Sequence, residues 1–319
     1  MSRKTQLAII IPCFNEELVI EYTVKRLLEV LKDLVNKEKI SQTSYIYLID
    51  DGSVDKTWEI IENLHANNNE QVKGLKFVRN YGNQKAIMAG LLGVHKLGCD
   101  CVISIDADLQ QDENSIELFI DEYDKGAEIV SGIRNNRKTD SFFKKSTALC
   151  FYKLMNLFGV KIPLNHSDYR LVSKHALEIL EKYSERDLFL RGFFHETGLK
   201  TSYVHFDVKP RFAGVSKFNF ISLTNLALNG ITSYSIVPLR MVSAIGVIII
   251  FVSSLIGLDA ICDKLFFHQA SSGWATLVIL IAFFGGLQIF CLGIIGEYLG
   301  QIFNEVKNRQ RYIEEKELK

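Results

Sequence analysis

Acidic side chains follow three short apolar segments that are typical of buried β-strands. They are Glu16 and Glu17 after the first segment, Asp50 and Asp51 after the second, and Asp106 and Asp108 after the third. Carboxylates crowded at one place repel one another unless a positive charge lies among them. A hard divalent cation with oxygen ligands, which also binds a diphosphate, removes that repulsion. The three motifs therefore predict a site for Mg²⁺ or Mn²⁺ and a phosphorylated ligand.

The Asp106-Ala107-Asp108 motif is the most specific of the three. In an extended segment, residues two positions apart point to the same side, so both carboxylates could reach one cation. A lone motif of this kind is weak, because any acidic surface turn produces one. Its position after a buried strand, with two further acidic strand ends, makes the metal interpretation the favoured one.

Apolar runs alternate with helical patterns over the first 131 residues. The expected strands are Leu7–Ile11, Tyr45–Ile49, Leu75–Val78, Val102–Ile105 and Ile129–Ser131, and the expected helices are Glu17–Val35, Asp55–Asn67, Gln84–Leu97 and Glu113–Lys125. This alternation predicts an α/β fold with a parallel sheet covered by helices on both faces. Ligands of such sheets lie beyond the carboxyl ends of the strands, where the acidic motifs are. The chain lacks GxGxxG after the first strand and lacks GxxxxGK[ST], which disfavours dinucleotide oxidoreductases and P-loop NTPases.

Two long apolar segments lie near the C-terminus. Met241–Leu258 carries no charge, and the most polar residue of Trp274–Gly296 is Gln288. At about 1.5 Å rise per residue, both lengths match a hydrocarbon core of about 30 Å. The segments predict two transmembrane helices, at about 239–262 and 274–297.

The charges beside these segments predict the orientation in the membrane. Basic residues lie outside the pair, at Lys209, Arg211, Lys217 and Arg240 on one flank and at Lys307, Arg309 and Arg311 on the other. The loop between the two segments holds Asp259, Asp263 and Lys264. The positive-inside rule then places both flanks and both termini in the cytoplasm of a plasma-membrane protein. The N-terminal apolar run is too short for a signal peptide, which agrees with a cytoplasmic N-terminus.

The expected domains follow from these segments. Residues 1–217 form a cytosolic α/β domain, 218–237 a juxtamembrane helix, 238–300 the two spans and 301–319 a charged cytosolic tail. Apolar residues recur every three or four positions in Phe218–Val237, which is typical of an amphipathic helix at the membrane interface. An ordinary surface helix that packs on its own domain is the alternative.

The composition excludes some classes. Of 319 residues, 37 are basic and 37 are acidic, so the net charge is zero and bulk nucleic-acid binding is disfavoured. A mean hydropathy of +0.10 with 23% charged residues indicates a polar domain joined to concentrated apolar segments. The six cysteines have no zinc-site spacing and are expected to be reduced thiols.

Several motifs together give the chain a family resemblance. Besides the acidic strand ends, these motifs are Asn80-Tyr81-Gly82-Asn83-Gln84-Lys85-Ala86, Gly132-Ile133-Arg134, Asp168-Tyr169-Arg170-Leu171, Arg191-Gly192, the stretch 211–217 (RFAGVSK) and the stretch 235–240 (SIVPLR). In this order, they resemble glycosyltransferase family 2 with its GT-A-type fold. With two C-terminal spans, the chain is similar to the polyprenyl-phosphate glycosyltransferases, the bactoprenol glucosyltransferase and dolichyl-phosphate mannosyltransferase-like group.

The resemblance implies roles for individual residues. The nucleotide-sugar pocket would be lined by Pro12, Phe14, Glu16, Asp50, Asp51, Lys85, Ala107, Gln110 and Arg134, with Asp51 favoured over Asp50. Asp106 and Asp108 would hold the metal. The diphosphate and the lipid phosphate would be held by Arg134, Lys144, Arg211 and Lys217. Asp168 would lie near the acceptor as a positioning residue or weak base, or else form a salt bridge to Arg170.

The sequence departs from the family pattern at two places. Phe14 stands where the family usually has Tyr, so one hydroxyl contact is lost. Gln111-Asp112-Glu113 stands where the family usually has Asp-Pro-Pro or His-Pro-Pro, so the loop after Gln110 is expected to have a different shape.

The implied reaction is transfer of a sugar from a nucleotide sugar to undecaprenyl or another polyprenyl phosphate, with inversion, for cell-envelope glycosylation. UDP-glucose is the favoured donor, and UDP-GlcNAc, UDP-galactose and formamido-arabinose donors stay open. The implied partners are the membrane lipid, a flippase and further copies of the chain, as in a tetramer. A processive polysaccharide synthase is disfavoured because the chain lacks a Gln-x-x-Arg-Trp motif. A non-catalytic scaffold that binds nucleotide sugar is disfavoured because every expected acidic residue is present.

Overall fold

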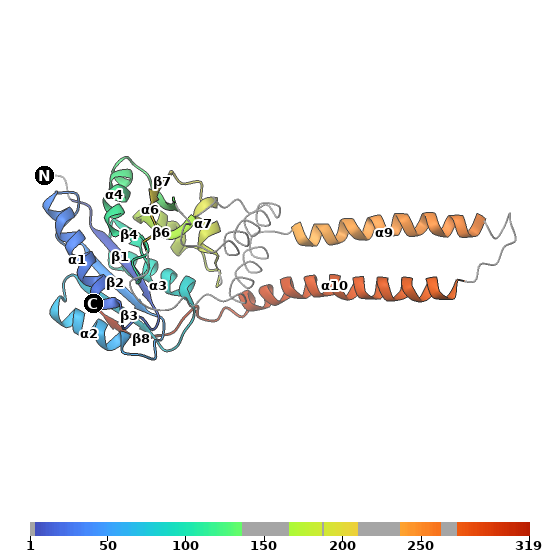
Figure 1. Cartoon of the computed structure of the whole chain (residues 1–319), viewed down its shortest axis with the longest axis horizontal. Coiled ribbons are helices and arrows are strands. Elements are labelled where there is room, and N and C mark those ends of the chain that lie inside the picture. Colours follow the sequence, from blue (N-terminus) through green and yellow to red (C-terminus); the bar gives the residue numbers. More distant parts are fainter. Residues whose placement is uncertain (1–3, 136–165, 187, 210–236, 263–272) are drawn as a thin grey trace.

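The protein consists of an α/β body from which two long helices project side by side (Figure 1). The computed structural model describes residues 4–135, 166–186, 188–209, 237–262 and 273–319. The expected interface helix therefore lies outside the described residues except for its last residue, as do Lys144, Arg211 and Lys217.

The centre of the body is a sheet of eight strands within the described residues, in the order β7-β5-β6-β4-β1-β2-β3-β8. The strands are β1 (Leu7–Cys13), β2 (Tyr45–Asp50), β3 (Val72–Phe77), β4 (Cys101–Ser104), β5 (Ile129–Arg134), β6 (His166–Ser173), β7 (Thr201–Phe206) and β8 (Glu314–Leu318). Strands β1–β4, β5 and β7 run in one direction, and β6 and β8 run in the other. The predicted α/β fold with a mainly parallel sheet is thus confirmed.

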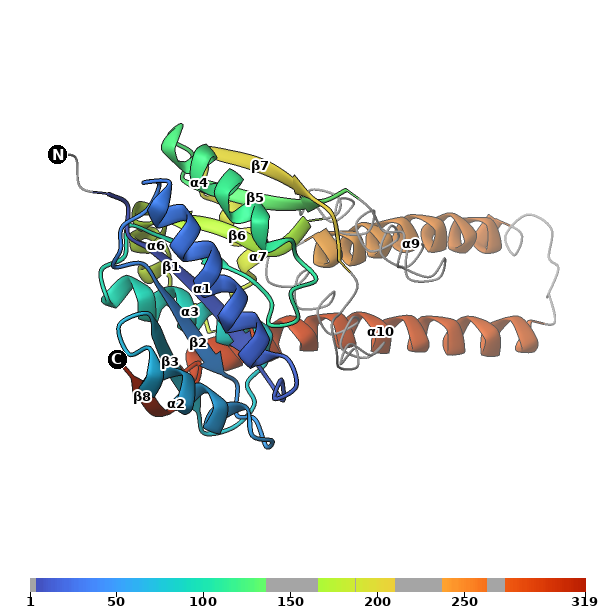
Figure 2. The ribbon, with the colours of Figure 1, turned by 60° about the vertical axis from the view of Figure 1, so that its left-hand side comes forward.

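Helices cover both faces of the sheet. They are α1 (Ile20–Asn36), α2 (Thr57–Asn67), α3 (Asn83–Lys96), the short 3-10 helix η1 (Glu113–Ser115), α4 (Ile116–Asp124), α6 (Lys174–Glu181) and α7 (Leu190–Glu196). Figure 2 shows α1, α2 and α4 on the near face. Alternate residues of β1 serve the two faces, because Ile9 packs in the core under these helices and Ile10 packs under α3, α6 and α7. A strand buried on both faces reads as a continuous apolar run, which is why the sequence reveals it.

Strands β6, β7 and β8 were not predicted. Strand β6 lies in the middle of the sheet and pairs antiparallel with both β4 and β5. Strand β8 comes from the segment expected to be only a charged tail, and it pairs antiparallel with β3 at the sheet edge. Tyr312, just before β8, stacks on Phe77 with ring centroids 4.8 Å apart. The chain after α10 thus returns to the body and completes its sheet.

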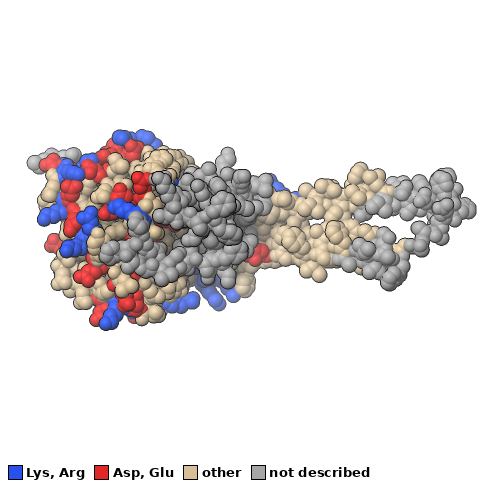
Figure 3. Space-filling view, in the orientation of Figure 1, with Lys and Arg blue, Asp and Glu red and all other residues tan. Residues whose placement is uncertain are grey.

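The two projecting helices are α9 (Val237–Cys262) and α10 (Trp274–Val306). Within the described residues, Phe283–Val306 is the one stretch long and apolar enough to cross a membrane, and Val237–Ile249 is a shorter apolar stretch. Large apolar side chains such as Phe251, Ile281 and Ile289 are exposed on these helices. Charged residues cover the body but are nearly absent from the visible part of both helices (Figure 3). Exposed apolar surface of this extent marks contact with a membrane or another protein.

Candidate active site

The loops after β1 and β2 interlock at the carboxyl edge of the sheet. Cys13 and Asp50 are paired in the parallel ladder, and the Asp51 N–H donates to the Cys13 carbonyl at 2.8 Å. The Asn15 N–H donates to Ser53 Oγ at 2.9 Å, and Asn15 Oδ1 accepts from the Val54 N–H at 2.9 Å. Strand β4 lies on the other side of β1, so its acidic motif reaches the same edge. The expected convergence of the three acidic strand ends is therefore observed.

The Asp50-Asp51 pair is buried, with 0% and 3% exposure. Asp51 accepts hydrogen bonds from the Tyr81 and Gly82 backbone N–H groups at 2.6 and 2.9 Å, so it holds the loop between β3 and α3. Asp50 accepts from the backbone N–H and the hydroxyl of Ser53. Burial raises the pKa of Asp51 to about 6, although the two N–H groups oppose that shift. Both carboxylates are thus engaged in building the loops around them.

Gly52 and Lys85 complete this part of the edge. Gly52 has φ +67°, and a Cβ atom there would lie 2.2 Å from the carbonyl carbon of Arg79. Only glycine allows that close approach of the two loops without strain. Lys85, in the first turn of α3, favours the ionised form of Asp51 by its charge and so lowers that pKa.

The Asp106-Ala107-Asp108 segment is half-buried at Asp106 and Asp108 and is fixed by its neighbours. The Thr23 hydroxyl of α1 donates to the Ala107 carbonyl at 2.6 Å. Asp108 Oδ1 accepts from the Gln110 N–H at 3.1 Å. Burial and the charges of Asp108 and Asp168 raise the pKa of Asp106 to about 7, and the charges of Arg134 and Arg191 oppose this.

Asp168, on β6, lies close enough to Asp106 to act on its pKa. It forms a two-pronged ion pair with Arg191 of α7, with Nε donating to Oδ1 at 2.8 Å and Nη2 donating to Oδ2 at 2.7 Å. From the sequence, Arg170 was the alternative partner of Asp168, but Arg170 donates to Ser131 Oγ at 3.4 Å and lies 4.5 Å from the Phe194 ring. Arg191 was not assigned a role from the sequence, because 23 residues separate it from Asp168.

Hydrogen bonds and ion pairs hold the loop after Gln110, where the sequence departs from the family pattern. The Gln110 carbonyl accepts from the Lys209 N–H at 2.9 Å. Lys209 Nζ pairs with Asp112 at 2.8 Å and Glu113 at 2.6 Å, and Glu113 also pairs with Arg26 of α1 at 3.2 Å. These ion pairs tie the segment that follows Asp108 to α1 and to the end of β7.

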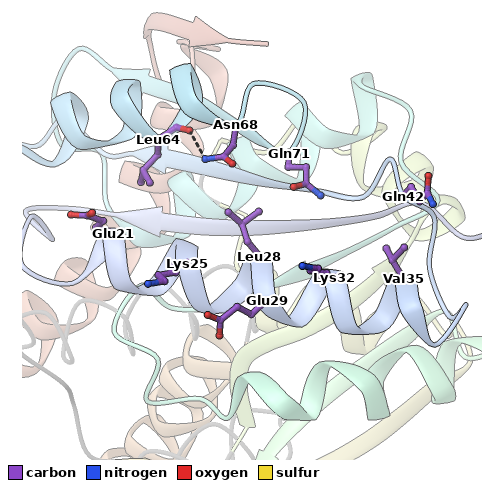
Figure 4. A pocket seen from close by; sticks show the side chains of 10 residues that line it. All are labelled: Glu21, Lys25, Leu28, Glu29, Lys32, Val35, Gln42, Leu64, Asn68 and Gln71. Carbon is purple, nitrogen blue, oxygen red and sulfur yellow. Dashed lines mark hydrogen bonds between the residues drawn. The ribbon is translucent and has the colours of Figure 1, made fainter.

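The other predicted residues of the edge are also located. Pro12, Phe14 and Glu16 are half-buried where β1 ends, Ala107 is buried, and Gln110 and Arg134 are half-buried. A separate open groove of about 610 Å³ lies between α1 and α2, lined by Lys25, Leu28 and Asn68 among others (Figure 4). None of the predicted site residues lines this groove.

The donor set at Asp106 and Asp108 suits a hard divalent cation. Within the described residues there is no group of three or more acidic, His or Cys side chains that could enclose a metal. Mg²⁺ is commonly held by one or two carboxylates, with substrate phosphates and waters as the other ligands. Two neighbouring half-buried carboxylates, of which Asp108 raises the pKa of Asp106 by its charge, match that pattern.

Comparison with known proteins identifies the family. Residues 8–180 match the family described as glycosyl transferase family 2, which covers more than half of the chain. The chain belongs to glycosyl transferase family 2. With the mainly parallel sheet, this makes the body a GT-A-like α/β domain.

The relatives match over nearly the whole chain. The chain is 48% identical to the uncharacterized glycosyltransferase YkoT of Bacillus subtilis, over 96% of this chain and 90% of the relative. It is 40% identical to the SfII prophage-derived bactoprenol glucosyl transferase of Shigella flexneri, over 97% of both chains. Among solved structures, it resembles glucosyl-3-phosphoglycerate synthase from Mycobacterium tuberculosis with TM-score 0.44 and 14% identity, covering 72% of this chain and 77% of that one.

Proposed function

We propose that this chain transfers glucose from UDP-glucose to undecaprenyl phosphate or a related polyprenyl phosphate. The supporting observation is its 40% identity to bactoprenol glucosyl transferases over 97% of both chains. That identity extends through the two projecting helices, so it is not limited to the nucleotide-sugar domain. The product would be a lipid-linked monosaccharide for later use in the cell envelope.

The acidic edge would hold the donor. Asp106 and Asp108 would bind Mg²⁺ or Mn²⁺ together with the diphosphate, and the bound cation would stabilise the charge on the leaving UDP as a Lewis acid. Arg134 lies near Asp106 and supplies a positive charge for the same diphosphate. The remaining pocket residues would be Pro12, Phe14, Glu16, Asp50, Asp51, Lys85, Ala107 and Gln110.

The acceptor would need no strong base. The anomeric carbon forms a bond to an oxygen of the lipid phosphate, and its bond to UDP breaks with the electron pair leaving on the diphosphate. Because the second pKa of a phosphate monoester is about 6, the attacking oxygen is already ionised at pH 7. Asp168, held by Arg191, would therefore orient the acceptor side of the site. Attack from the face opposite UDP would invert the anomeric centre.

The projecting helices would place the site at the membrane. We propose that both span it, at about 239–262 and 274–297, with the body and both termini in the cytoplasm. The domain limits 1–217, 218–237 and 238–300 belong to the same proposal, whereas Glu314–Leu318 of the segment 301–319 belongs to the sheet of the body as β8. Lys144, Arg211 and Lys217, which lie outside the described residues, would hold the lipid phosphate. A flippase and further copies of the chain, as in a tetramer, complete the proposed partners.

The test uses the purified full-length chain in detergent with undecaprenyl phosphate and Mn²⁺ or Mg²⁺. UDP-glucose, UDP-GlcNAc and UDP-galactose are supplied separately, each with a radiolabelled sugar. We expect label from UDP-glucose to enter the organic phase and EDTA to abolish this transfer. Transfer from UDP-GlcNAc or UDP-galactose instead would correct the donor. Failure of all three donors with a folded protein would contradict the proposal and favour a scaffold that only binds nucleotide sugar.

A further inference from the structure

We propose that Gln111 is a positioning residue that orients Asp106 toward the cation and couples it to the strand that carries Asp168. This inference rests on the proposed function, because it gives Gln111 a role in the metal-bound donor site. Gln111 was not among the candidate residues from the sequence, where it stood only as a departure from the family pattern.

The amide of Gln111 contacts Asp106 at two points. Its Oε1 accepts from the Asp106 backbone N–H at 2.9 Å, and its Nε2 donates to Asp106 Oδ2 at 2.6 Å. Together, the two bonds restrain the direction of the Asp106 carboxylate relative to its backbone. The orientation of the Gln111 amide is determined by these partners, since a backbone N–H can only donate and a carboxylate oxygen accepts.

The same amide also reaches β6. Gln111 Nε2 donates to Ser167 Oγ at 3.3 Å, and Ser167 directly precedes Asp168. The Ser104 hydroxyl, at the end of β4, donates to the Asp168 carbonyl. Gln111 therefore connects the loop of the acidic motif to the neighbouring strand that carries the third carboxylate.

Because Gln111 is buried, loss of these hydrogen bonds would not be compensated by water. Gln111 is 1% exposed, so each polar atom of its side chain needs a partner inside the protein. An apolar replacement would leave the Asp106 N–H and Oδ2 without these partners. A glutamate would place a second carboxylate against Oδ2 in a site that already holds three. A neutral amide supplies the one acceptor and the donors that this position requires.

The arrangement leaves one oxygen of Asp106 for a cation. Oδ2 is engaged by Gln111, whereas Oδ1 accepts no hydrogen bond from any residue in the described parts of the chain. Groups that hydrogen-bond a ligating carboxylate fix its direction, and their loss typically weakens metal binding about 10- to 100-fold.

The experiment compares the full-length wild type with Gln111→Met, which keeps the side-chain length and removes the amide. Mn²⁺ is titrated into each protein in detergent with saturating UDP, and free Mn²⁺ is followed by electron paramagnetic resonance. We expect about 10- to 100-fold weaker Mn²⁺ binding in the variant, and a KM for Mn²⁺ in the transfer reaction that rises by a similar factor. Metal-free UDP binding should change less than about twofold, because the change acts on the metal ligand.

Ser44→Ala is the matched control for loss of a buried polar group. Ser44 is 1% exposed, accepts from the Leu7 N–H at 3.1 Å and donates to the Ser41 carbonyl at 2.7 Å, near the start of β1. It should lower the melting temperature and leave the Mn²⁺ affinity unchanged. If Gln111→Met does not fold, Ser167→Ala keeps both bonds of Gln111 to Asp106 and removes its link to β6, together with the bond from the Tyr169 N–H to Ser167 Oγ at 3.3 Å. This variant should weaken Mn²⁺ binding about two- to fivefold.

The outcomes separate this inference from the proposed function. The positioning role is overturned if a folded Gln111→Met binds Mn²⁺ with wild-type affinity. If Gln111→Met does not fold, wild-type Mn²⁺ affinity in Ser167→Ala overturns it. An equal loss of affinity in Ser44→Ala also overturns it, because the effect would then be general destabilisation. A wild-type chain that binds no Mn²⁺ with UDP and transfers no sugar contradicts the proposed function itself.

Discussion

Two pairs of aspartates lie at the same edge of the sheet, one pair after β2 and the other after β4. The two pairs differ in what surrounds them. Asp50 and Asp51, after β2, are buried and accept hydrogen bonds from Ser53, Tyr81 and Gly82. Asp106 and Asp108, after β4, are half-exposed, and their charges oppose each other. In the sequence both pairs are simply acidic residues after an apolar strand.

The difference shows how one residue type serves two purposes. A carboxylate that accepts backbone N–H groups holds loops in place. A carboxylate pair that is half-exposed and mutually repelling is stabilised by a cation. We therefore assign the first pair to building the pocket, and we propose that the second pair binds Mg²⁺ or Mn²⁺. The predictions below test this division, in order of decreasing effect.

Asp108→Ala should have the largest effect on activity and little effect on folding. We expect glucose transfer to fall about 100- to 1,000-fold, since loss of a metal ligand removes charge stabilisation of the leaving diphosphate. The melting temperature and membrane insertion should stay close to those of the wild type. Metal-dependent turnover at the wild-type rate would contradict the metal role of this pair.

Gly52→Ala should damage the pocket-building region instead. The alanine Cβ would meet the Arg79 backbone at 2.2 Å, and φ is +67°. Left-handed strain and overpacking together predict a loss of about 2–5 kcal/mol in the free energy of unfolding, measured by denaturant titration in detergent. Gly98→Ala, where φ is also positive but no atom lies within 4 Å, is the control and should cost less. Equal losses in both variants would exclude the close approach to Arg79 as the cause.

The pH dependence of stability should reveal Asp51. Its pKa is raised from 3.8 to about 6, so the folded state binds a proton more tightly than the unfolded state. Relative to Asp51→Asn, the wild type should therefore lose about 3 kcal/mol of unfolding free energy between pH 3 and 7, of which about 2 kcal/mol falls between pH 4 and 6. A pH-independent difference between the two proteins would show that Asp51 does not titrate in this range.

Ser53→Ala should have the smallest effect. It removes the hydroxyl that donates to Asp50 and accepts from the Asn15 N–H. We expect a loss of about 1 kcal/mol in unfolding free energy and no change in Mn²⁺ affinity. A clear change in Mn²⁺ affinity would mean that the two acidic pairs do not act separately.

The sequence predicted the first half of the fold well, because the strands there are buried on both faces. Leu7–Cys13 is a continuous apolar run, and the carboxyl end of each such strand locates an acidic motif. Strand β8 has the sequence EEKEL, which carries no apolar pattern. Its position depends on pairing with β3 and on contacts such as Tyr312 with Phe77, and such contacts between distant segments are not visible in local sequence.

The site was predicted by residue type but not by arrangement. The sequence indicated Asp106 and Asp168 but could not show that Arg191 pairs with Asp168 or that Gln111 binds Asp106. Both partners are recognised only when β6, α7 and the loop after β4 are placed together. Asp51 was correctly placed at the edge, but its bonds to Tyr81 and Gly82 needed the structure.

The division between the two acidic pairs is tested most directly by Mn²⁺ titration in the presence of saturating UDP, with the wild type, Asp108→Ala and Asp51→Asn side by side. We expect Asp108→Ala to weaken Mn²⁺ binding at least about 100-fold, and Asp51→Asn to stay within about threefold of the wild type. Strong Mn²⁺ binding in Asp108→Ala together with its loss in Asp51→Asn would contradict the account.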